Sequence, residues 1–478
     1  MKVLFVTSEC HPFIKTGGLG DVAWSLPRAL KEEGVEIAVI LPKYSQIPNR
    51  FKIKMKHVTN FTVNVSYREQ YCGVESLKMD GITYYFIDNM YYFDREGAYG
   101  YIDDGERFSF FSQAVIEAME KIKFIPDVLH VNDWHTAIIP LLLKVKYQWI
   151  EAFRDIKTVL TIHNLKFQGV YPFEALGDLL SIGDSVMVDD GVEYYGMVNY
   201  MKGGINYADW VTTVSPTYAR EIKYEFYGEG LHGLMARVDY KLSGIVNGID
   251  VKLNNPATDT FIPFNFSTKD LSGKDRCKKA LREELGLPQL EVPLIGIISR
   301  LTDQKGLDIL APVLEELLNQ ELQMVVVGTG DRRYEDMFHY FAAKYPNKIS
   351  SQMRFDLGLA QRVYAGCDMM MVPSQFEPCG LTQMVSMRYG TVPIVRETGG
   401  LKDTVIPYNE YTGKGLGFTF TNYDSEDLKN AVYRALYVYR DQKDAWRKIM
   451  LAGMKADHSW TRSAREYEAI YRDIIEME

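Results

Sequence analysis

Short apolar segments that end in polar residues, each followed by a helix-like pattern, recur along this chain and constrain its fold more than any other feature. In the first half, strands of this kind are predicted at residues 2–8, 35–41, 127–132, 157–162 and 210–214. A strand that is followed by a helix and then by another strand builds a parallel sheet covered by helices. The sequence therefore predicts a doubly wound α/β fold.

The same pattern restarts in the second half of the 478 residues. Strands are predicted at 292–299, 323–327, 368–372 and 391–395, with one helix over 306–318. Between the two series, residues 247–274 are rich in Asn, Asp, Thr and Pro and show little periodicity. We therefore predict two doubly wound domains with a cleft between them, at 1–246 and 247–458. A final helix within 459–478 has an apolar face that requires a covering surface.

Composition narrows the class of partner. The formal net charge of −9 argues against binding to nucleic acid or to an anionic membrane, because both require an extended basic surface. Five scattered cysteines form no metal-binding or disulfide pattern, and no apolar run approaches the ~20 residues of a membrane span. We expect a cytoplasmic protein whose partner is a small anion or a neutral polymer.

A glycine-rich segment follows the first predicted strand. It contains Gly17, Gly18 and Gly20, with Lys15 before them and Asp21 after them. Backbone N–H groups of such a loop can approach a phosphate, and the helix that starts next adds a partial positive charge. We predict that this helix covers residues 21–33 with Asp21 as its N-cap. The alternative is a structural tight turn, which does not explain the lysine.

Polar residues also follow two predicted strands of the second half. Arg300 and Lys305 lie five positions apart across a loop and together can neutralise a diphosphate as it departs, unless they are only solvated charges. Glu377 can accept hydrogen bonds from sugar hydroxyls, or it can cap the next helix. Phosphate or sugar oxygens could be bound by the backbone N–H groups of Cys379, Gly380, Leu381 and Thr382.

His163 directly follows the predicted strand 157–162, so its ring or its carbonyl group would face the site. A half-buried histidine with satisfied hydrogen bonds is the alternative. Trp134 and His135 follow another strand, and a role in packing is as well supported for them as a role in binding. Cys379 has no histidine partner in its vicinity, so we do not predict that it is a nucleophile.

Several of these segments together resemble a known family. Residues 15–22 (KTGGLGDV) resemble the N-terminal signature of bacterial and plastid glycogen (starch) synthases, which is highly specific. The resemblance extends over nearly the whole chain, in matching order and spacing, through residues 130–135, 161–165, 246–250, 299–306 and 377–383.

The resemblance implies a fold and an activity. The fold would be GT-B, in which two Rossmann-like domains surround a deep cleft and the C-terminal helix packs on the first domain. The activity would be retaining transfer of glucose from ADP-glucose to the non-reducing end of an α-1,4-glucan, such as glycogen or a maltooligosaccharide, in glycogen biosynthesis. No metal and no cofactor are expected.

The resemblance also implies roles for individual residues. His163 would lie against the transferred glucose, Asp133 and Asn247 near the sugar and the acceptor, and Arg300 with Lys305 at the diphosphate. Asp21 would orient the glucose or the loop. Phe355 stands where the family tends to have a tyrosine against the base, although a core position is equally compatible with it. Val385 stands where many retaining transferases of this fold carry a second glutamate.

Other functions make different predictions for the sequence. An oxidoreductase on the same type of sheet needs an acidic ribose ligand after the second strand, where this chain has Leu41, Pro42 and Lys43. An inactive glucan-binding protein would show losses among the charged candidates, all of which are present. A phosphorylase needs a pyridoxal-phosphate lysine motif that we do not find. We therefore expect a glucosyltransferase.

Overall fold

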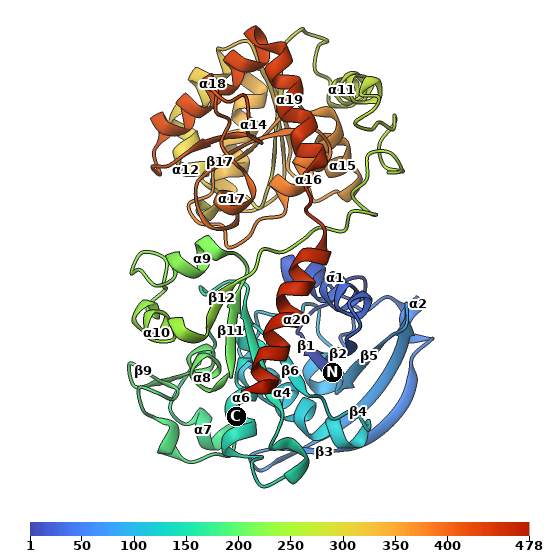
Figure 1. Ribbon diagram of the computed structural model, residues 1–478, viewed down its shortest axis with the longest axis vertical. Coiled ribbons are helices and arrows are strands. Elements are labelled where there is room, and N and C mark those ends of the chain that lie inside the picture. Colours follow the sequence, from blue (N-terminus) through green and yellow to red (C-terminus); the bar gives the residue numbers. More distant parts are fainter. Residues whose placement is uncertain (478) are drawn as a thin grey trace. The chain divides into compact units, whose positions relative to one another are not determined.

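The computed structural model describes residues 1–477 and divides into two compact units (Figure 1). Unit 1 comprises Met1–Asn247 together with the chain from Trp460 onward, and unit 2 comprises Gly248–Ser459. Each unit has its own hydrophobic core. Within the described residues, no helix is both long enough and apolar enough to cross a membrane.

Unit 1 is built on a nine-stranded sheet with the strand order β12-β11-β7-β6-β1-β2-β5-β4-β3. Its first seven strands are parallel to one another. At the β5 edge, β4 pairs antiparallel with β5, and β3 pairs antiparallel with β4. The strands are β1 (Lys2–Val6), β2 (Glu36–Pro42), β3 (Lys56–Val65), β4 (Arg68–Met79), β5 (Ile82–Asp88), β6 (Val128–Asn132), β7 (Lys157–Ile162), β11 (Trp210–Thr213) and β12 (Leu242–Gly244). A separate small sheet contains β8 (Val170–Tyr171), β10 (Met197–Asn199) and β9 (Glu193–Tyr194).

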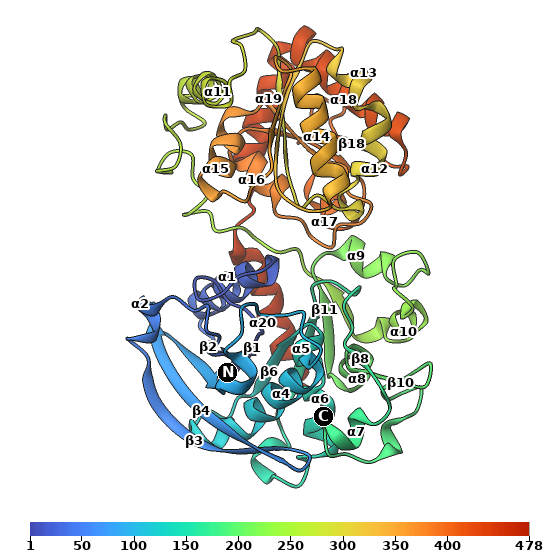
Figure 2. The same ribbon diagram turned by 180° about the vertical axis from the view of Figure 1, so that it is seen from behind.

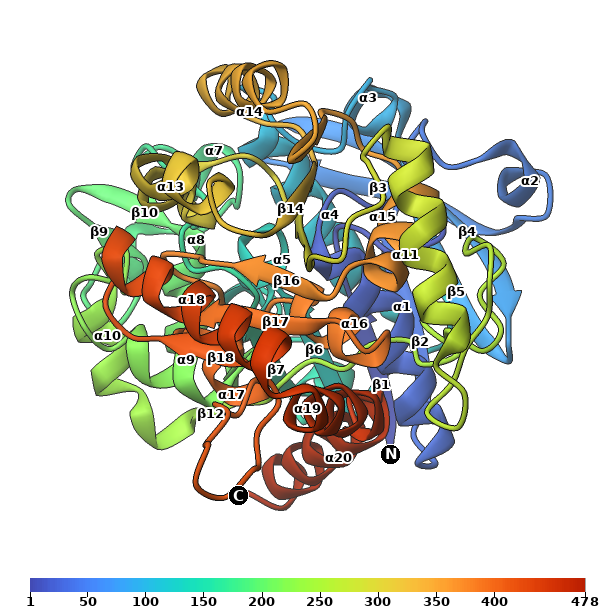
Figure 3. The ribbon, with the colours of Figure 1, turned by 90° about the horizontal axis from the view of Figure 1, so that it is seen from above.

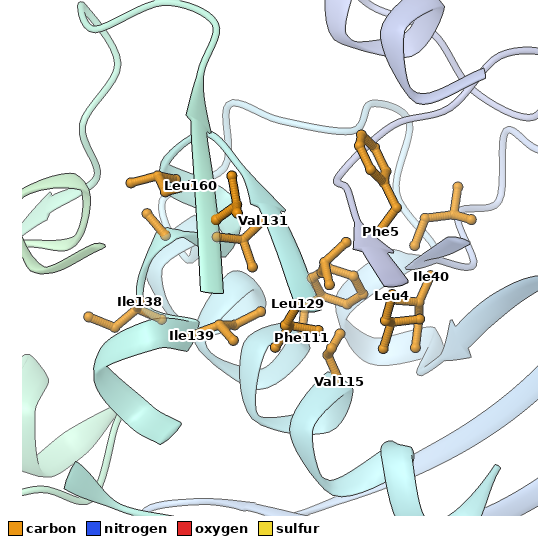
Figure 4. Close-up of a cluster of buried hydrophobic side chains, with 14 of the residues drawn as sticks. Leu4, Phe5, Ile40, Phe111, Val115, Leu129, Val131, Ile138, Ile139 and Leu160 are labelled. Carbon is orange, nitrogen blue, oxygen red and sulfur yellow. The ribbon is translucent and has the colours of Figure 1, made fainter. Parts of the chain in front are cut away.

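Alternation along the strands sends side chains to both faces of this sheet. Leu4 of β1 pairs with Leu129 of β6, and both lie on the face where Phe111 of helix α4 (Asp104–Lys121) packs (Figure 4). The next pair, Phe5 with His130, points to the opposite face. Both faces are therefore buried, which is why these strands read as almost continuous apolar runs.

Helices cover the two faces of the nine-stranded sheet. Helices α1 (Gly18–Glu32) and α20 (Trp460–Glu476) pack together in front of the strands in Figure 1, and α4 with α6 (Ile139–Val145) lies in front of them in the view from behind (Figure 2). The remaining helices of unit 1 are α2 (Asn49–Lys52), α3 (Met90–Phe93), α5 (Trp134–Ala137), α7 (Ala175–Asp178), α8 (Tyr200–Tyr207), α9 (Pro216–Glu221) and α10 (His232–Arg237).

The C-terminal helix α20 is attached to the sheet by a buried polar chain. The Tyr471 hydroxyl lies 2.6 Å from Nδ1 of His130, and Nε2 of that ring lies 2.6 Å from the Thr161 hydroxyl. Burial lowers the pKa of His130 to about 3, so the ring is neutral. His130 therefore has a structural role, and unit 1 supplies the covering surface that the apolar face of this helix requires.

Unit 2 has a six-stranded parallel sheet with the order β15-β14-β13-β16-β17-β18. Helix α18 packs against strands β17 and β18 (Figure 3), and α19 contacts α18 and β17. The strands are β13 (Leu294–Ile298), β14 (Gln323–Val327), β15 (Ile349–Gln352), β16 (Met369–Val372), β17 (Val392–Arg396) and β18 (Phe418–Phe420). The helices are α11 (Ser272–Leu285), α12 (Leu307–Leu310), α13 (Leu314–Leu318), α14 (Arg332–Lys344), α15 (Leu357–Gly366), α16 (Thr382–Arg388), α17 (Gly399–Thr404), α18 (Ser425–Asp441) and α19 (Lys443–Lys455).

The strand order reverses once in each unit. In unit 1, β1 lies between β2 and β6, and in unit 2, β13 lies between β14 and β16. At such a point the loops that leave two neighbouring strands diverge to opposite sides of the sheet, which opens a crevice at their carboxyl ends. The loops after β1, β6, β13 and β16 are those that carry most of the predicted site residues.

Two local predictions were wrong, and one pair of strands was not predicted. The first helix starts at Gly18, not at Asp21, and its N-cap is Gly17. The helix expected over 306–318 is broken into α12, a 3₁₀ turn at Ala311–Val313 and α13, because Pro312 has no N–H to continue the ladder. The antiparallel pair β3–β4 was not predicted, because exposed polar residues interrupt the apolar residues along both strands, so neither reads as an apolar run.

Candidate functional site

The glycine-rich loop of unit 1 ends in helix α1. Asp21 lies in the first turn of that helix, and its carboxylate forms an ion pair with Lys15, whose Nζ is 2.7 Å away. Asp21 is not the N-cap, because the helix starts three residues earlier, at Gly18, with Gly17 as its N-cap. Lys15, Gly17 and Gly18 are all exposed at the surface of unit 1.

The N–H groups of this loop already have an acceptor. The buried carboxylate of Glu9, which follows β1, accepts hydrogen bonds from the N–H groups of Gly17 and Gly20 at 3.0 and 2.9 Å. Sequence reasoning did not identify Glu9. The only available signal was an acidic residue three positions after the end of an apolar strand.

Asp133 and His163 are brought together by the pairing of β6 with β7. The His163 N–H donates to Oδ1 of Asp133 at 2.7 Å. Asp133 itself has a φ of 55°, a conformation that non-glycine residues seldom adopt and that occurs preferentially at functional sites. The contact joins two residues that are thirty positions apart in the sequence.

The neighbouring Asn132 sets the tautomer of His163. The Asn132 amide group donates to the carbonyl oxygen of Val6 at 2.9 Å, so its Oδ1 is an acceptor. Nε2 of His163 lies 2.9 Å from that oxygen and must therefore carry the proton. Burial lowers the pKa of His163 to about 3, which leaves the imidazole neutral. Asn132 was not singled out from the sequence.

Burial also changes the acidity of Asp133. It raises the pKa of the carboxyl group from 3.8 to about 7, against the opposing effect of the N–H groups of His163 and Asn164. The negative charge of Glu9 raises it further. Glu9 and Asp133 therefore interact electrostatically, as expected for residues at the carboxyl ends of the adjacent strands β1 and β6.

Trp134 and His135 stack on each other with ring centroids 4.2 Å apart. His135 also packs against Phe108 and Tyr99, and burial lowers its pKa to about 3. Trp134 additionally lines a surface hollow of about 420 Å³ in unit 1. The other lining residues are Lys166, Phe167, Gln168, Gly169, Val170, Tyr171, Tyr194 and Glu229.

Asn247 is the last residue of the first segment of unit 1. Its side chain is buried, and Oδ1 accepts no hydrogen bond from any residue of the described chain. A buried amide oxygen without a donor carries an energetic cost, so this atom is available to a ligand hydroxyl.

In unit 2, the reversal between β13 and β16 brings Lys305 to Glu377. Nζ of Lys305 lies 2.7 Å from Oε2 of Glu377, and the Ser374 hydroxyl donates to the same oxygen at 2.9 Å. Arg300 is exposed, and its guanidinium forms no ion pair with any residue up to position 477. Ser374 was not predicted, because a serine after a strand has no distinctive sequence signal.

The segment that carries Glu377 is fixed by two glycines from the start of α17. Gly400 donates its N–H to the Glu377 carbonyl oxygen at 3.1 Å. A Cβ at Gly399, which has a φ of +46°, would lie only 1.8 Å from that same oxygen, so no other residue fits there. Glu377 does not cap α16, because the N-cap of that helix is Leu381.

The other predicted residues of unit 2 lie just before α16, within α16, or after β15. Gly380 adopts a left-handed conformation, and Thr382 begins α16. Cys379 is buried, like the other four cysteines. Phe355 follows β15 with an exposed fraction of 80%, so it is not a core residue. Val385 is buried within α16.

Within residues 1–477, no three His, Cys, Asp or Glu side chains are grouped so that they could hold a metal ion. The positive charge at Glu377 comes from Lys305, whose Nζ lies 2.7 Å from the carboxylate.

Two protein families match this chain. Residues 2–237 match the family described as starch synthase catalytic domain, and residues 278–448 match glycosyl transferases group 1. Among curated relatives, the glycogen synthase of Clostridium novyi is 52% identical over 477 residues, which is 99% of both chains. The glycogen synthase of Clostridioides difficile is 49% identical over the full length of both chains.

Solved structures agree with the fold. The catalytic domain of starch synthase IV from Arabidopsis thaliana, determined with ADP and acarbose bound, superposes with a TM-score of 0.92 at 33% identity and covers 99% of each chain. A sucrose-phosphate synthase from Thermosynechococcus elongatus superposes with a TM-score of 0.62 at 17% identity, over 99% of this chain and 98% of that one. The fold is therefore GT-B, as the sequence predicted.

The raised pKa of Asp133 predicts a specific pH dependence of stability. Between pH 3.8 and about 7 the folded protein retains a proton that the unfolded chain releases, so wild-type stability falls as the pH rises through this window. The slope contributed is at most about 1.4 kcal/mol per pH unit. Asp133→Asn removes this contribution but keeps an acceptor for His163.

Urea unfolding of both proteins between pH 5 and 8 measures this difference. We expect the variant to gain stability relative to wild type up to about pH 7, with no further change above it. Parallel stability curves across the range would contradict the raised pKa.

Proposed function

Because the chain belongs to the family of glycogen and starch synthases, we propose that it uses ADP-glucose as donor and the non-reducing end of an α-1,4-glucan as acceptor. The chain is a glucosyltransferase, and its family transfers glucose with retention of configuration. The observation that carries the proposal is the ion pair between Lys305, which follows β13, and Glu377, which follows β16; Arg300 lies on the same loop as Lys305.

We assign the donor diphosphate to Arg300 and Lys305. As the bond between glucose C1 and the phosphate oxygen breaks, the leaving ADP gains negative charge, which two nearby cations stabilise. Arg300 is exposed and has no competing carboxylate, and Lys305 is held in place by Glu377. These two cations make a metal unnecessary for charge neutralisation, and we propose that neither a metal nor a cofactor takes part.

We assign the glucose hydroxyls to Glu377 and to the backbone around it. Both hydrogen bonds that the carboxylate accepts fall on Oε2, which leaves Oε1 for a sugar hydroxyl. The N–H groups between Cys379 and Thr382 are proposed to bind donor oxygens at the same place. The buried Val385 means that no second carboxylate on α16 assists Glu377.

Groups of unit 1 are also proposed to bind the transferred glucose. His163 is neutral, and its Nε2–H is already donated to Asn132, so it is assigned to positioning through its carbonyl group or Nδ1 and not to proton donation. Asp133, Asn247 and Asp21 are assigned to the sugar and the acceptor. Lys15, Gly17 and Gly18 form the loop beside them.

The reaction then needs no dedicated base. The acceptor 4-hydroxyl oxygen forms a bond to C1 on the face that ADP leaves, and ADP departs with the bonding electrons. The hydroxyl proton passes to the departing phosphate oxygen. This scheme explains why the buried groups of unit 1 need not change their protonation state during transfer.

We propose that the acceptor lies in the surface hollow of unit 1. Its walls include Trp134, Phe167, Tyr171 and Tyr194, and aromatic faces stack on the apolar faces of sugar rings. Such a surface binds a neutral polymer, in agreement with the net charge of −9. A cytoplasmic location, where ADP-glucose and glycogen occur together, is part of the same proposal.

Arg300→Ala tests the assignment of the diphosphate. We expect kcat to fall by at least about 10²-fold, the usual cost of removing a charge stabiliser from a transition state. The melting temperature should not change, because Arg300 is exposed. Arg332→Ala is a matched control, since this arginine on α14 has a side chain that is 92% exposed. Similar turnover in both variants would refute the role.

Phe355→Ala tests whether the nucleotide base of the donor stacks on Phe355. Stacking on an exposed aromatic ring favours adenine over uracil by about 1 kcal/mol, which is less than a factor of ten. We expect wild type to prefer ADP-glucose over UDP-glucose by more than about tenfold in kcat/KM, with a smaller preference in the variant. Tyr411→Ala is the control, at a position that is 90% exposed. Equal use of both donors by wild type would exclude ADP-glucose as the specific donor.

Phe167→Ala tests the position of the acceptor. Phe167 lines the hollow with an exposed fraction of 56%, so its loss should raise the KM for maltooligosaccharide about tenfold while the KM for ADP-glucose stays unchanged. Phe173→Ala is the control, because Phe173 is 46% exposed in the same unit but does not line the hollow. An unchanged acceptor KM in Phe167→Ala would place the glucan elsewhere.

A further inference from the structure

The Glu9 carboxylate lies beneath the glycine-rich loop, with only 2% of the residue exposed. Oε1 accepts the N–H groups of Gly17 and Gly20 at 3.0 and 2.9 Å. Oε2 accepts the N–H of Thr16 at 3.2 Å and also the hydroxyl of the same residue. One side chain therefore holds the loop through three of its residues, Thr16, Gly17 and Gly20.

All of these donors are uncharged. The Tyr99 hydroxyl adds a fifth hydrogen bond at 3.2 Å, and in the chain up to residue 477 no lysine, arginine or histidine pairs with Glu9. A carboxylate buried without a basic partner requires several strong hydrogen bonds. Glu9 obtains them at the start of the 15-residue helix α1, where the helix dipole also favours a negative charge.

Glu9 thus occupies the place that a phosphate would take at such a helix. The N–H groups of Gly17 and Gly20 point inward to its carboxylate, so the outward face of the loop presents Lys15 instead. The stem of Lys15 lies over Gly20, where an added Cβ would come within 3.0 Å of Cγ of the lysine. The position of Lys15 therefore depends on the loop, and the loop depends on Glu9.

We propose that Glu9 is a positioning residue for glucosyl transfer, which acts by holding the glycine-rich loop so that Lys15 and its partner Asp21 face the substrate. Glu9 itself does not touch the substrate. The inference rests on the proposed function, because the loop that carries Lys15 is proposed there to lie beside the groups that bind the sugar and the acceptor. It also assigns the donor phosphates to cationic side chains and not to the N–H groups of Gly17 and Gly20.

A purely structural role for Glu9 would have a different signature. Loss of general stability would reduce activity independently of Lys15, so the effects of changing the two residues would multiply. Positioning through Lys15 predicts the opposite. Once the Lys15 side chain has been removed, a further change at Glu9 should cause little additional loss of activity.

A double-mutant cycle with Glu9→Gln and Lys15→Ala separates the two roles. Glutamine keeps the size of the side chain but places an NH₂ group against N–H donors, which displaces the loop. We expect Glu9→Gln to lower kcat/KM for ADP-glucose about 10²-fold, the usual effect of a small misplacement of a reacting group. In the Lys15→Ala background the further loss should be under about threefold. A full additional 10²-fold loss would overturn the proposal.

Hydrogen exchange provides a readout that does not depend on activity. The amides of residues 16–20 should exchange slowly in wild type and at least about tenfold faster in Glu9→Gln. Glu106→Gln is the matched control: its carboxylate is half-buried, accepts the Tyr92 hydroxyl at 2.6 Å, and lies on α4, outside the loop. Unchanged exchange at residues 16–20 would overturn the proposal.

The outcomes also distinguish this inference from the proposed function. A wild-type protein without transfer activity would refute the proposed function. Faster amide hydrogen exchange at residues 16–20 in Glu9→Gln would still show that Glu9 positions the loop. If Glu9→Gln does not fold, Thr16→Ala removes one donor to the same carboxylate and is measured in the same way. An active Thr16→Ala enzyme with unchanged kcat/KM and unchanged loop exchange would overturn the proposal.

Discussion

The pairing of β1 with β6 in unit 1, and of β13 with β16 in unit 2, is the constraint on which the candidate site residues of each unit depend. At each of these pairs the strand order reverses, so the loops that leave the two strands diverge and leave a crevice at their carboxyl ends. In unit 1 the loop from Glu9 to Gly20 and the residue Asp133 are placed there. In unit 2 the same rule brings Lys305 to within 2.7 Å of Glu377, although 72 positions separate them in the sequence.

Much of this arrangement could be predicted from the sequence. Buried parallel strands read as apolar runs, and the polar residues that follow them mark the carboxyl edge of the sheet, which is why His163, Lys305 and Glu377 were identified. Asp133 was identified through the family resemblance. The division into two α/β halves followed from the restart of the same pattern. The resemblance to the glycogen synthases supplied the activity and the GT-B fold, and the comparisons confirmed both.

The remaining features depend on which side chains meet, and local sequence does not specify this. Glu9 became visible only through its hydrogen bonds to the loop, and Asn132 only through its two bonds to Val6 and His163. Asp21 is a residue type that often caps helices, but α1 already starts at Gly18, and Asp21 in its first turn pairs with Lys15. These residues share a feature: each fixes the orientation of a neighbour that has a more recognisable sequence signal.

The central claim is that the chain forms an α-1,4 bond to glucose with the configuration of the donor retained. The most direct measurement is nuclear magnetic resonance of the product formed from ADP-glucose labelled with ¹³C at glucose C1 and an unlabelled maltooligosaccharide. We expect the label to appear in an α linkage at the non-reducing end of a lengthened chain, with one ADP released for each glucose added. A β linkage, or label released as free glucose without chain lengthening, would contradict it.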